Sequence, residues 1–351
     1  MAATVRSDIV IPEIFTPYLE EATTLRNAFI ASGVVQPLEA LNAVADGGDY
    51  VNVPFFDANL SGDAEVLADN ASLTPGAITA DKQRGVVLHR GRAWGVRELA
   101  KLASGGDPMA AIGNKVAAYI AHQQQKDLLA SLAGVFGAVG SANTGAAFID
   151  LTFDAGGSGE TPLTPRHIAK ARALLGDQGD KLSAICMHSA VYYDLVERRA
   201  IDYVTASEAR ATAAASNAAT PDVFGGSVAG AYTADGSVPF YMGMRVIVSD
   251  DVQTSGSSSS KKYATYFFTP GAVASGEQQG LKTEVDRDIL ALADYMAVSW
   301  HNVFHPIGAQ YQTAGGANPS QATLATITNW TKVYETKNIG IVRGTVTSNF
   351  D

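Results

Sequence analysis

The chain has little that would support disulfide chemistry, membrane insertion or a signal peptide. It has 351 residues and one cysteine, Cys186, so no intrachain disulfide can form and no oxidising compartment is required. Cys186 lies in an apolar strand-like run, 182–187, which indicates a buried thiol rather than a nucleophile. No run reaches the roughly 18 apolar residues of a membrane span. The first residues lack the apolar region of a signal peptide. We therefore expect folding in the cytoplasm and no membrane partner.

Positive charge is scarce. Lys and Arg total 25 against 35 Asp and Glu, a formal net charge of −10. Binding of nucleic acid through phosphate neutralisation needs clustered Lys and Arg, so sequence-specific DNA binding is not expected. The densest positive segment is 89–97, HRGRAWGVR, with Arg90, Arg92 and Arg97. We interpret it as a cluster that meets carboxylates of a neighbouring subunit, with scattered surface arginines as the alternative.

Motifs for catalysis, cofactor binding and metal binding are also missing. The chain has no phosphate-binding G-x-x-x-x-G-K-[ST], no G-x-G-x-x-G and no H-E-x-x-H. The segment 224–230, FGGSVAG, misses the G-x-S-x-G nucleophile elbow by one position and is interpreted as a Gly-rich loop. His301 and His305 would lie about 13 Å apart in a strand, too far for one ion. We predict no catalytic, cofactor or metal residues, and no enzyme.

Three carboxylates, Glu284, Asp286 and Asp288, alternate along what the pattern of 283–313 predicts to be one strand, which also carries His301 and His305. Such a row could collect calcium if a neighbouring chain added oxygens. A solvated face or a subunit interface is the favoured interpretation.

The rest of the chain mixes helices and strands without regular alternation, which favours an α+β fold. The clearest helix begins at Asp107-Pro108, an N-cap followed by a first-turn proline, and runs to about Phe136. We also expect the following elements: helices at 16–31, 165–175 and 189–199, a short helix that starts at Asn318-Pro319-Ser320, strands at 181–187, 238–248, 261–269 and 339–347, and a mobile loop at 205–220.

Residues 50–98 are predicted to form a long hairpin with a polar span in the middle. Its first arm includes Phe55, and the span carries Leu60, Val66, Leu67 and Leu73 without a strand pattern. A connection of this length is uncommon in a compact domain unless it is functional or disordered. We expect a neighbouring molecule to order it, and we place these five apolar residues, with the arginines and carboxylates above, at contacts between subunits.

Five segments in order carry a resemblance to a known family: GMRVIVSDDV (243–252), YATYFFTPGAV (263–273), EVDRD (284–288), WHNVFHPIGAQY (300–311) and NWTKVYETKNIGIV (329–342). Together they resemble the major capsid proteins of tailed bacteriophages, which share the Hong Kong 97-type capsid fold. The resemblance implies the following division: an N-terminal arm (1–49), an extended loop (50–98), a peripheral domain with a spine helix (99–145), an axial domain (146–282), return strands of the peripheral domain (283–313) and a C-terminal segment that completes the axial domain (314–351).

The resemblance also implies a structural role. Copies of the chain would form hexamers and pentamers that close an icosahedral shell around double-stranded DNA in the virion, after assembly in the host bacterial cytoplasm. Portal protein, a separate scaffolding protein and a cement protein are the implied partners. Some members cross-link through a lysine on the extended loop. Residues 54–81 contain no lysine and Lys82 lies late on the returning arm, so cross-linking is not carried over. The alternatives are an encapsulin-like nanocompartment shell and, more distantly, a soluble metal-dependent hydrolase.

Overall fold

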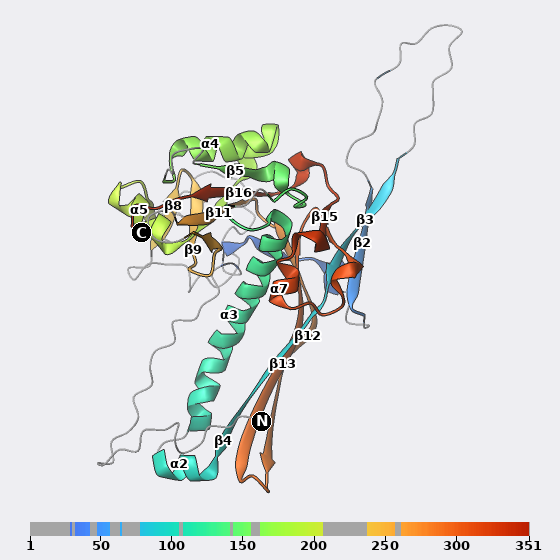
Figure 1. Cartoon of the computed structure of the whole chain (residues 1–351), viewed down its shortest axis with the longest axis vertical. Helices are drawn as coiled ribbons and strands as arrows, with labels where there is room; N and C mark the ends of the chain where they lie inside the picture. The colour runs from blue at the N-terminus through green and yellow to red at the C-terminus, as the bar shows by residue number, and fades with distance from the viewer. Residues whose placement is uncertain are drawn as a thin grey trace.

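The chain folds into a broad sheet with helices at one end and a long narrow sheet with a helix beside it (Figure 1). The structure, a computed structural model, describes residues 29, 32–42, 48–56, 64, 78–104, 108–140, 143–155, 162–205, 237–256 and 261–350. Helices and strands are mixed as an α+β fold, as predicted. Among the described residues, no helix combines the length and apolar character needed to cross a bilayer.

The broad sheet has the strand order β5-β16-β11-β6-β9-β8-β7, with β10 paired to β11. Its central strands are buried along their length because apolar side chains cover both faces of the sheet: Phe267 and its cross-strand partner Ile185 lie on one face, and Tyr266 and its partner Cys186 lie on the other. Helices α4 and α5 pack beside it. The elements are β5 (Thr152–Asp154), α4 (Pro165–Leu174), β6 (Ala184–Met187), α5 (Ser189–Glu197), β7 (Asp202–Thr205), β8 (Ser237–Tyr241), β9 (Met244–Val248), β10 (Thr254–Ser255), β11 (Lys262–Phe268) and β16 (Ile341–Val346).

The long sheet has the order β1-β12-β13-β4. The antiparallel pairing of β13 with β4 sets Trp300 opposite Arg90 and Met296 opposite Trp94. On β13, Met296, Val298 and Trp300 alternate onto one face and pack against α3. The elements are β1 (Val35–Pro37), α1 (Glu39–Asn42), β4 (Leu88–Arg97), α2 (Glu98–Ser104), α3 (Pro108–Phe136), β12 (Val273–Asp288) and β13 (Ala293–Pro306).

The spine helix α3 joins the two parts. Its first half packs on the long sheet through Val116 and Ile120, whereas its last turns are buried inside the main core through residues such as Leu132 and Phe136. Gly137, with φ of +81°, ends the helix. Arg343 of β16 donates a hydrogen bond of 2.6 Å to the Gly137 carbonyl, so the helix end is tied to the broad sheet.

The C-terminal segment crosses α3 before it returns to the broad sheet. It includes β14 (Ala309–Tyr311), α7 (Gln321–Leu324) and β15 (Trp330–Lys332). Trp330 is buried and its indole N–H donates to Leu324 O at 2.7 Å. The chain then ends in β16, which pairs with β11 in antiparallel register, Phe267 opposite Val342.

The predicted hairpin is shorter than 50–98. Strands β2 (Tyr50–Phe56) and β3 (Ala80–Val86) pair with each other in a separate two-stranded sheet that leads away from the body (Figure 1). Residues 88–97, expected as part of the returning arm, form β4 and pair with β13 instead. The hairpin prediction was wrong for this stretch because the same alternation of side chains suits either partner.

Two further strand predictions were wrong. The run 238–248 is two strands, β8 and β9, joined by a tight turn in which Met242 and Gly243 both have positive φ. The acidic row and the histidines do not share a strand either: the row lies on β12, the histidines on β13, and the two strands pair antiparallel. The expected helix at 16–31 and the loop at 205–220 lie almost wholly outside the described residues. The division into domains stays a prediction.

Candidate functional site

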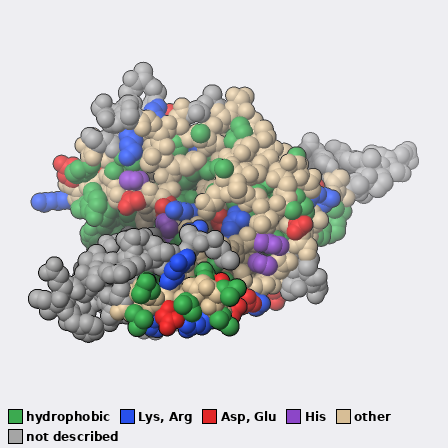
Figure 2. Space-filling model, turned by 60° about the horizontal axis from the view of Figure 1, so that its bottom comes forward, with side chains coloured by type: hydrophobic (Ala, Val, Ile, Leu, Met, Phe, Trp, Pro, Cys, Tyr) green, Lys and Arg blue, Asp and Glu red, His purple; other side chains and the backbone are tan. Residues whose placement is uncertain are grey.

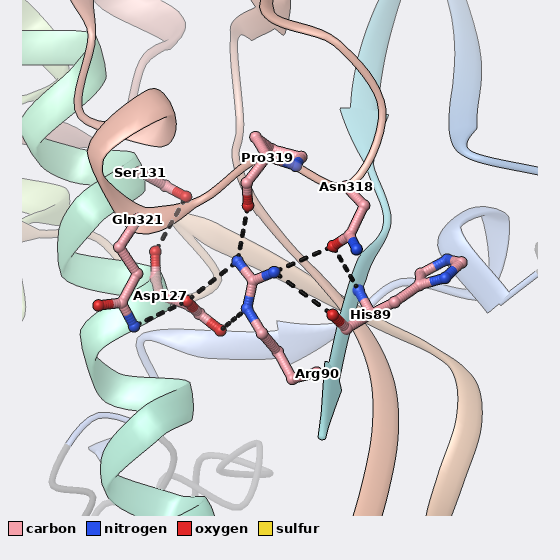
Figure 3. A network of polar contacts seen from close by, with 7 residues as sticks. All are labelled: His89, Arg90, Asp127, Ser131, Asn318, Pro319 and Gln321. Atoms are coloured by element: carbon pink, nitrogen blue, oxygen red, sulfur yellow. Dashed lines mark hydrogen bonds and ion pairs between the residues drawn. The ribbon is translucent and has the colours of Figure 1, made fainter. Parts of the chain in front are cut away.

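Arg90 and Asp127 are the centre of a buried joint between the long sheet and the spine helix (Figure 3). Arg90 Nε lies 3.2 Å from Asp127 Oδ2, and Nη2 lies 3.4 Å from Oδ1. The Asp127 side chain has no exposed surface. Burial raises the pKa of Asp127, while the charge of Arg90 and a hydrogen bond from Gln321 oppose that rise.

The joint also holds the C-terminal segment just before α7. Arg90 Nη2 donates to Pro319 O at 2.8 Å and Nη1 donates to Asn318 Oδ1 at 3.0 Å. Gln321 Nε2 donates to Asp127 Oδ1 at 3.0 Å. The guanidinium thus fixes β4, α3 and the segment at 318–321 relative to one another. Arg90 therefore has an intrachain role that its predicted place in a subunit contact did not include.

The far end of the long sheet carries an exposed apolar cluster, which we call the distal apolar patch. Its members are large apolar residues of α2, of the end of β12 and of the turn that joins β12 to β13, all more than half exposed: Leu99, Leu102, Val285, Ile289, Leu290 and Leu292. Leu290 is 98% exposed and Ile289 78%. In Figure 2, which turns this end of the molecule forward, hydrophobic side chains lie among acidic and basic ones at its lower edge. Exposed apolar clusters of this kind mark protein–protein contact sites.

Polar contacts hold the patch in shape. Arg287 lies 2.6 Å from Glu98, and the Glu98 amide donates to Leu292 O at 2.9 Å, so α2 and the turn are fastened together. Asp288 Oδ1 accepts hydrogen bonds from the amides of Leu290 (2.9 Å) and Ala291 (3.1 Å). The exposed apolar side chains therefore stand on an ordered turn, which lowers the entropy lost on docking.

The predicted contact carboxylates lie on β12 next to this patch. Glu284, Asp286 and Asp288 are all exposed. Glu284 pairs with Lys282, which lowers the pKa of that carboxyl. Asp288 caps the turn. Arg92 and Arg97 lie exposed on β4, which among the described residues is an edge strand.

The predicted contact residues of the extended loop are only partly described. Phe55 is half-buried and its ring packs edge-on against Tyr334, with centroids 4.7 Å apart. Its neighbour Phe56 is 68% exposed. The other four, Leu60, Val66, Leu67 and Leu73, lie outside the described residues.

The histidines and the cysteine singled out from the sequence pack against other side chains of the fold. Within the described ranges, no three His, Cys, Asp or Glu side chains are placed to hold a metal ion. His301 stacks on His89 with centroids 4.2 Å apart, and His305 is buried near Trp330. Cys186 is fully buried, and burial raises the pKa of its thiol.

Sequence reasoning missed the distal apolar patch and the partners of Arg90. A signal for the patch existed: Ile289-Leu290 directly follows the charged residues Arg287 and Asp288 at the end of an alternating run, where an exposed turn should be polar. No comparable signal linked Arg90 to Asp127 or to Pro319, which is 229 residues away.

Comparison with known proteins assigns the family. The model of the Gp13-like family, described as "Major capsid protein 13-like", matches residues 31–340. The major capsid protein of Bacillus phage SPP1 is 33% identical over 350 residues, 98% of each chain. Two solved structures are similar in fold: the capsid of cyanophage Pam1 (14% identity, TM-score 0.60, 97% of each chain) and that of Ralstonia phage GP4 (10% identity, TM-score 0.60, 96% of each chain).

These matches confirm the Hong Kong 97-type fold and the structural role that the resemblance implied. The match at 33% identity covers almost the whole chain, and the structural matches at 0.60 cover both the broad and the long sheet. The chain therefore belongs to the Gp13-like family of phage major capsid proteins, whose members are the structural subunits of virion shells.

Proposed function

We propose that copies of this chain assemble as hexamers and pentamers into an icosahedral shell around double-stranded phage DNA, with the distal apolar patch as a contact between copies. Membership of the capsid family supports self-assembly. The observation that carries the choice of contact is the exposure of Ile289 and Leu290, 78% and 98%, on an ordered turn. Burying one such side chain contributes about 1.5–3 kcal/mol, and a closed shell repeats that contact many times.

The hairpin β2–β3 is the second proposed contact. It leads away from the body, and its far end carries the exposed side chains of Phe56 and Ile78. Residues 57–77, with Leu60, Val66, Leu67 and Leu73, connect its strands. When the hairpin lies over a neighbouring subunit, these apolar side chains lose contact with water. The free energy gained by this burial offsets the conformational entropy that is lost when the long connection becomes ordered.

Exposed arginines and carboxylates can also contribute to the contacts between copies. Arg92 and Arg97 lie on β4, whereas Glu284, Asp286 and Asp288 lie on β12, and all five are exposed. Facing copies can therefore pair arginine with carboxylate, which contributes to register and specificity more than to affinity.

The contents and partners of the shell follow from the same role. A chain with a net charge of −10 can enclose packed DNA without binding a sequence. Portal, a separate scaffolding protein and a cement protein are the proposed partners, and assembly takes place in the host bacterial cytoplasm. The encapsulin-like compartment and the hydrolase are not favoured, because the matched relatives are phage capsid proteins.

A double variant tests the proposed contact. Ile289→Ser with Leu290→Ser should keep the melting temperature of the unassembled chain, because both side chains are exposed, and should abolish closed shells in negative-stain microscopy. Met242→Asn is the matched control: Met242 is 49% exposed at a turn with positive φ, which asparagine adopts readily. Normal shells from the double variant would refute the role of the patch.

A further inference from the structure

A cleft of about 790 Å³ opens between the spine helix, β1 and the long sheet. Ile120 and Gln124 line it from α3, and Val35 and Pro37 line it from β1. Residues 275–281 of β12 form one side. The floor comes from β13, through Trp300, His301, Asn302 and Phe304.

The floor carries buried polar atoms without partners. Asn302 is 6% exposed and Trp300 is 4% exposed. Asn302 Oδ1, Asn302 Nδ2 and Trp300 Nε1 make no hydrogen bond to any part of the chain that the structure describes. The two residues alternate with Phe304 on one face of β13, so the unpaired donors and acceptor lie together at the cleft. Buried polar groups are almost always paired, so this set points to a missing partner that both donates and accepts.

One wall of the cleft is the outer edge of β12. β1 pairs with β12 only at Val273–Ser275. Next along this edge, Leu41 of α1 lies against Gly276 and the Glu277 amide donates to Asn42 Oδ1 at 3.1 Å, and beyond Glu277 no strand among the described residues pairs with the outer edge of β12. The register between β12 and β13 also shifts twice between Glu277 and Lys282. An open strand edge beside unpaired amide groups suits an extended polypeptide, whose backbone alternates N–H and C=O groups.

We propose that this cleft binds an extended stretch of residues 1–28 of the same chain. Phe29 packs on Phe268 in the main core, with ring centroids 6.1 Å apart, and the chain then reaches β1, where Val35 and Pro37 line the cleft. Twenty-eight residues reach up to about 90 Å when extended, more than enough to return to the cleft. The segment contains the apolar run Ile9-Val10-Ile11, which can pack on Ile120 and Phe304 while its backbone meets Asn302.

Because the occupant belongs to the same chain, its linkage to β1 gives it a high effective concentration at the cleft. The binding is therefore independent of shell formation, and it fills the cleft between α3 and the long sheet in every copy. Loss of the contact exposes residues 1–28 and the β12 edge together.

Hydrogen exchange on the full chain tests the proposal. Peptides from residues 1–28 and 276–282 should be protected in the wild-type chain. Asn302→Leu, which removes both amide atoms at similar volume, should speed their exchange at least ten-fold, with a parallel rise in tryptic cleavage at Arg6 and Arg26. Gln124→Trp, which narrows the cleft from the half-buried face of α3, should do the same without altering the floor. Asn338→Leu is the control, because Asn338 is exposed and not among the residues that line the cleft.

Three results would overturn the proposal. Residues 1–28 could exchange as an unprotected peptide in the wild-type chain, or remain equally protected in both cleft variants. Protection could also vanish when the chain is diluted to monomer, which would assign the cleft to a segment of another copy. Negative-stain microscopy of the same samples reports on shell formation separately, so failure of this inference is distinguishable from failure of the shell proposal.

Discussion

Arg90 and Asp127 form a two-point ion pair that fastens β4 to α3. The Asp127 side chain is fully buried, whereas that of Arg90 is 19% exposed. The same guanidinium also binds Pro319 O and Asn318 Oδ1. One side chain therefore sets the position of the long sheet, and with it the distal apolar patch, relative to the main body.

Removing Arg90 should weaken the fold strongly. Arg90→Ala leaves the Asp127 carboxylate buried without its counter-charge, and breaking a buried pair in this way costs about 3–5 kcal/mol. Urea unfolding followed by circular dichroism measures the free energy of unfolding. The control is Arg92→Ala on the same strand, where the side chain is exposed and the change should stay within about 0.5 kcal/mol. Equal changes in the free energy of unfolding for the two substitutions would show that the Arg90–Asp127 pair does not stabilise the fold.

Two glycines of α3 should respond to alanine in opposite directions. A Cβ at Gly134 would overlap Leu324 O and the indole of Trp330, whereas a Cβ at Gly113 meets nothing within 4 Å. We expect Gly113→Ala to stabilise by up to about 1 kcal/mol through helix propensity. Gly134→Ala should destabilise by about 1–3 kcal/mol because the C-terminal segment must move. Thermal unfolding measures both, and stabilisation by Gly134→Ala would contradict the close approach.

Local patterns in the sequence predicted the spine helix and most buried strands. The proline at 108 and the glycine at 137 bracket α3 closely, because helix ends depend on nearby residues. The turn at Met242-Gly243 was missed because methionine rarely adopts positive φ, so only Gly243 signalled it.

Pairings between distant segments could not be read from the sequence. The alternation of apolar and polar side chains in 88–97 indicates a strand but does not show which strand pairs with it. The strand that does, β13, is some two hundred residues away. The same limit applies to the site. Arg90 was recognised as part of a charged cluster, but its burial against Asp127 depends on how α3 and β4 pack. Exposure of Leu290 likewise depends on the turn that Asp288 caps.

Acid should destabilise the chain through His305. Burial lowers the pKa of His305 to about 4, against about 6.5 in an unfolded chain. The unfolded chain therefore binds the proton more readily, so the stability that His305 contributes is complete above about pH 6.5 and is lost as the pH falls towards 4. His305→Phe removes this titration. The free energy of unfolding should therefore fall by about 2–3 kcal/mol less in this variant than in the wild-type chain between pH 7 and pH 4.5. The urea midpoints of both chains at the two pH values measure this difference. An equal loss of stability in the wild-type chain and in the variant would contradict the role given to His305.

The single cysteine should report on opening of the broad sheet. Cys186 is fully buried on β6 and burial raises the pKa of its thiol, so the native chain presents no reactive thiolate. We expect a thiol reagent at neutral pH to label the native chain at least a hundred-fold more slowly than the urea-unfolded chain. Labelling of the native chain at the unfolded rate would show that β6 is accessible.

The most direct test is a cryo-electron microscopy reconstruction of particles that contain this chain. The account expects a closed icosahedral shell in which a neighbouring copy covers Ile289 and Leu290 in every subunit. Particles in which both side chains face solvent throughout, or preparations that contain only small open oligomers, would contradict it.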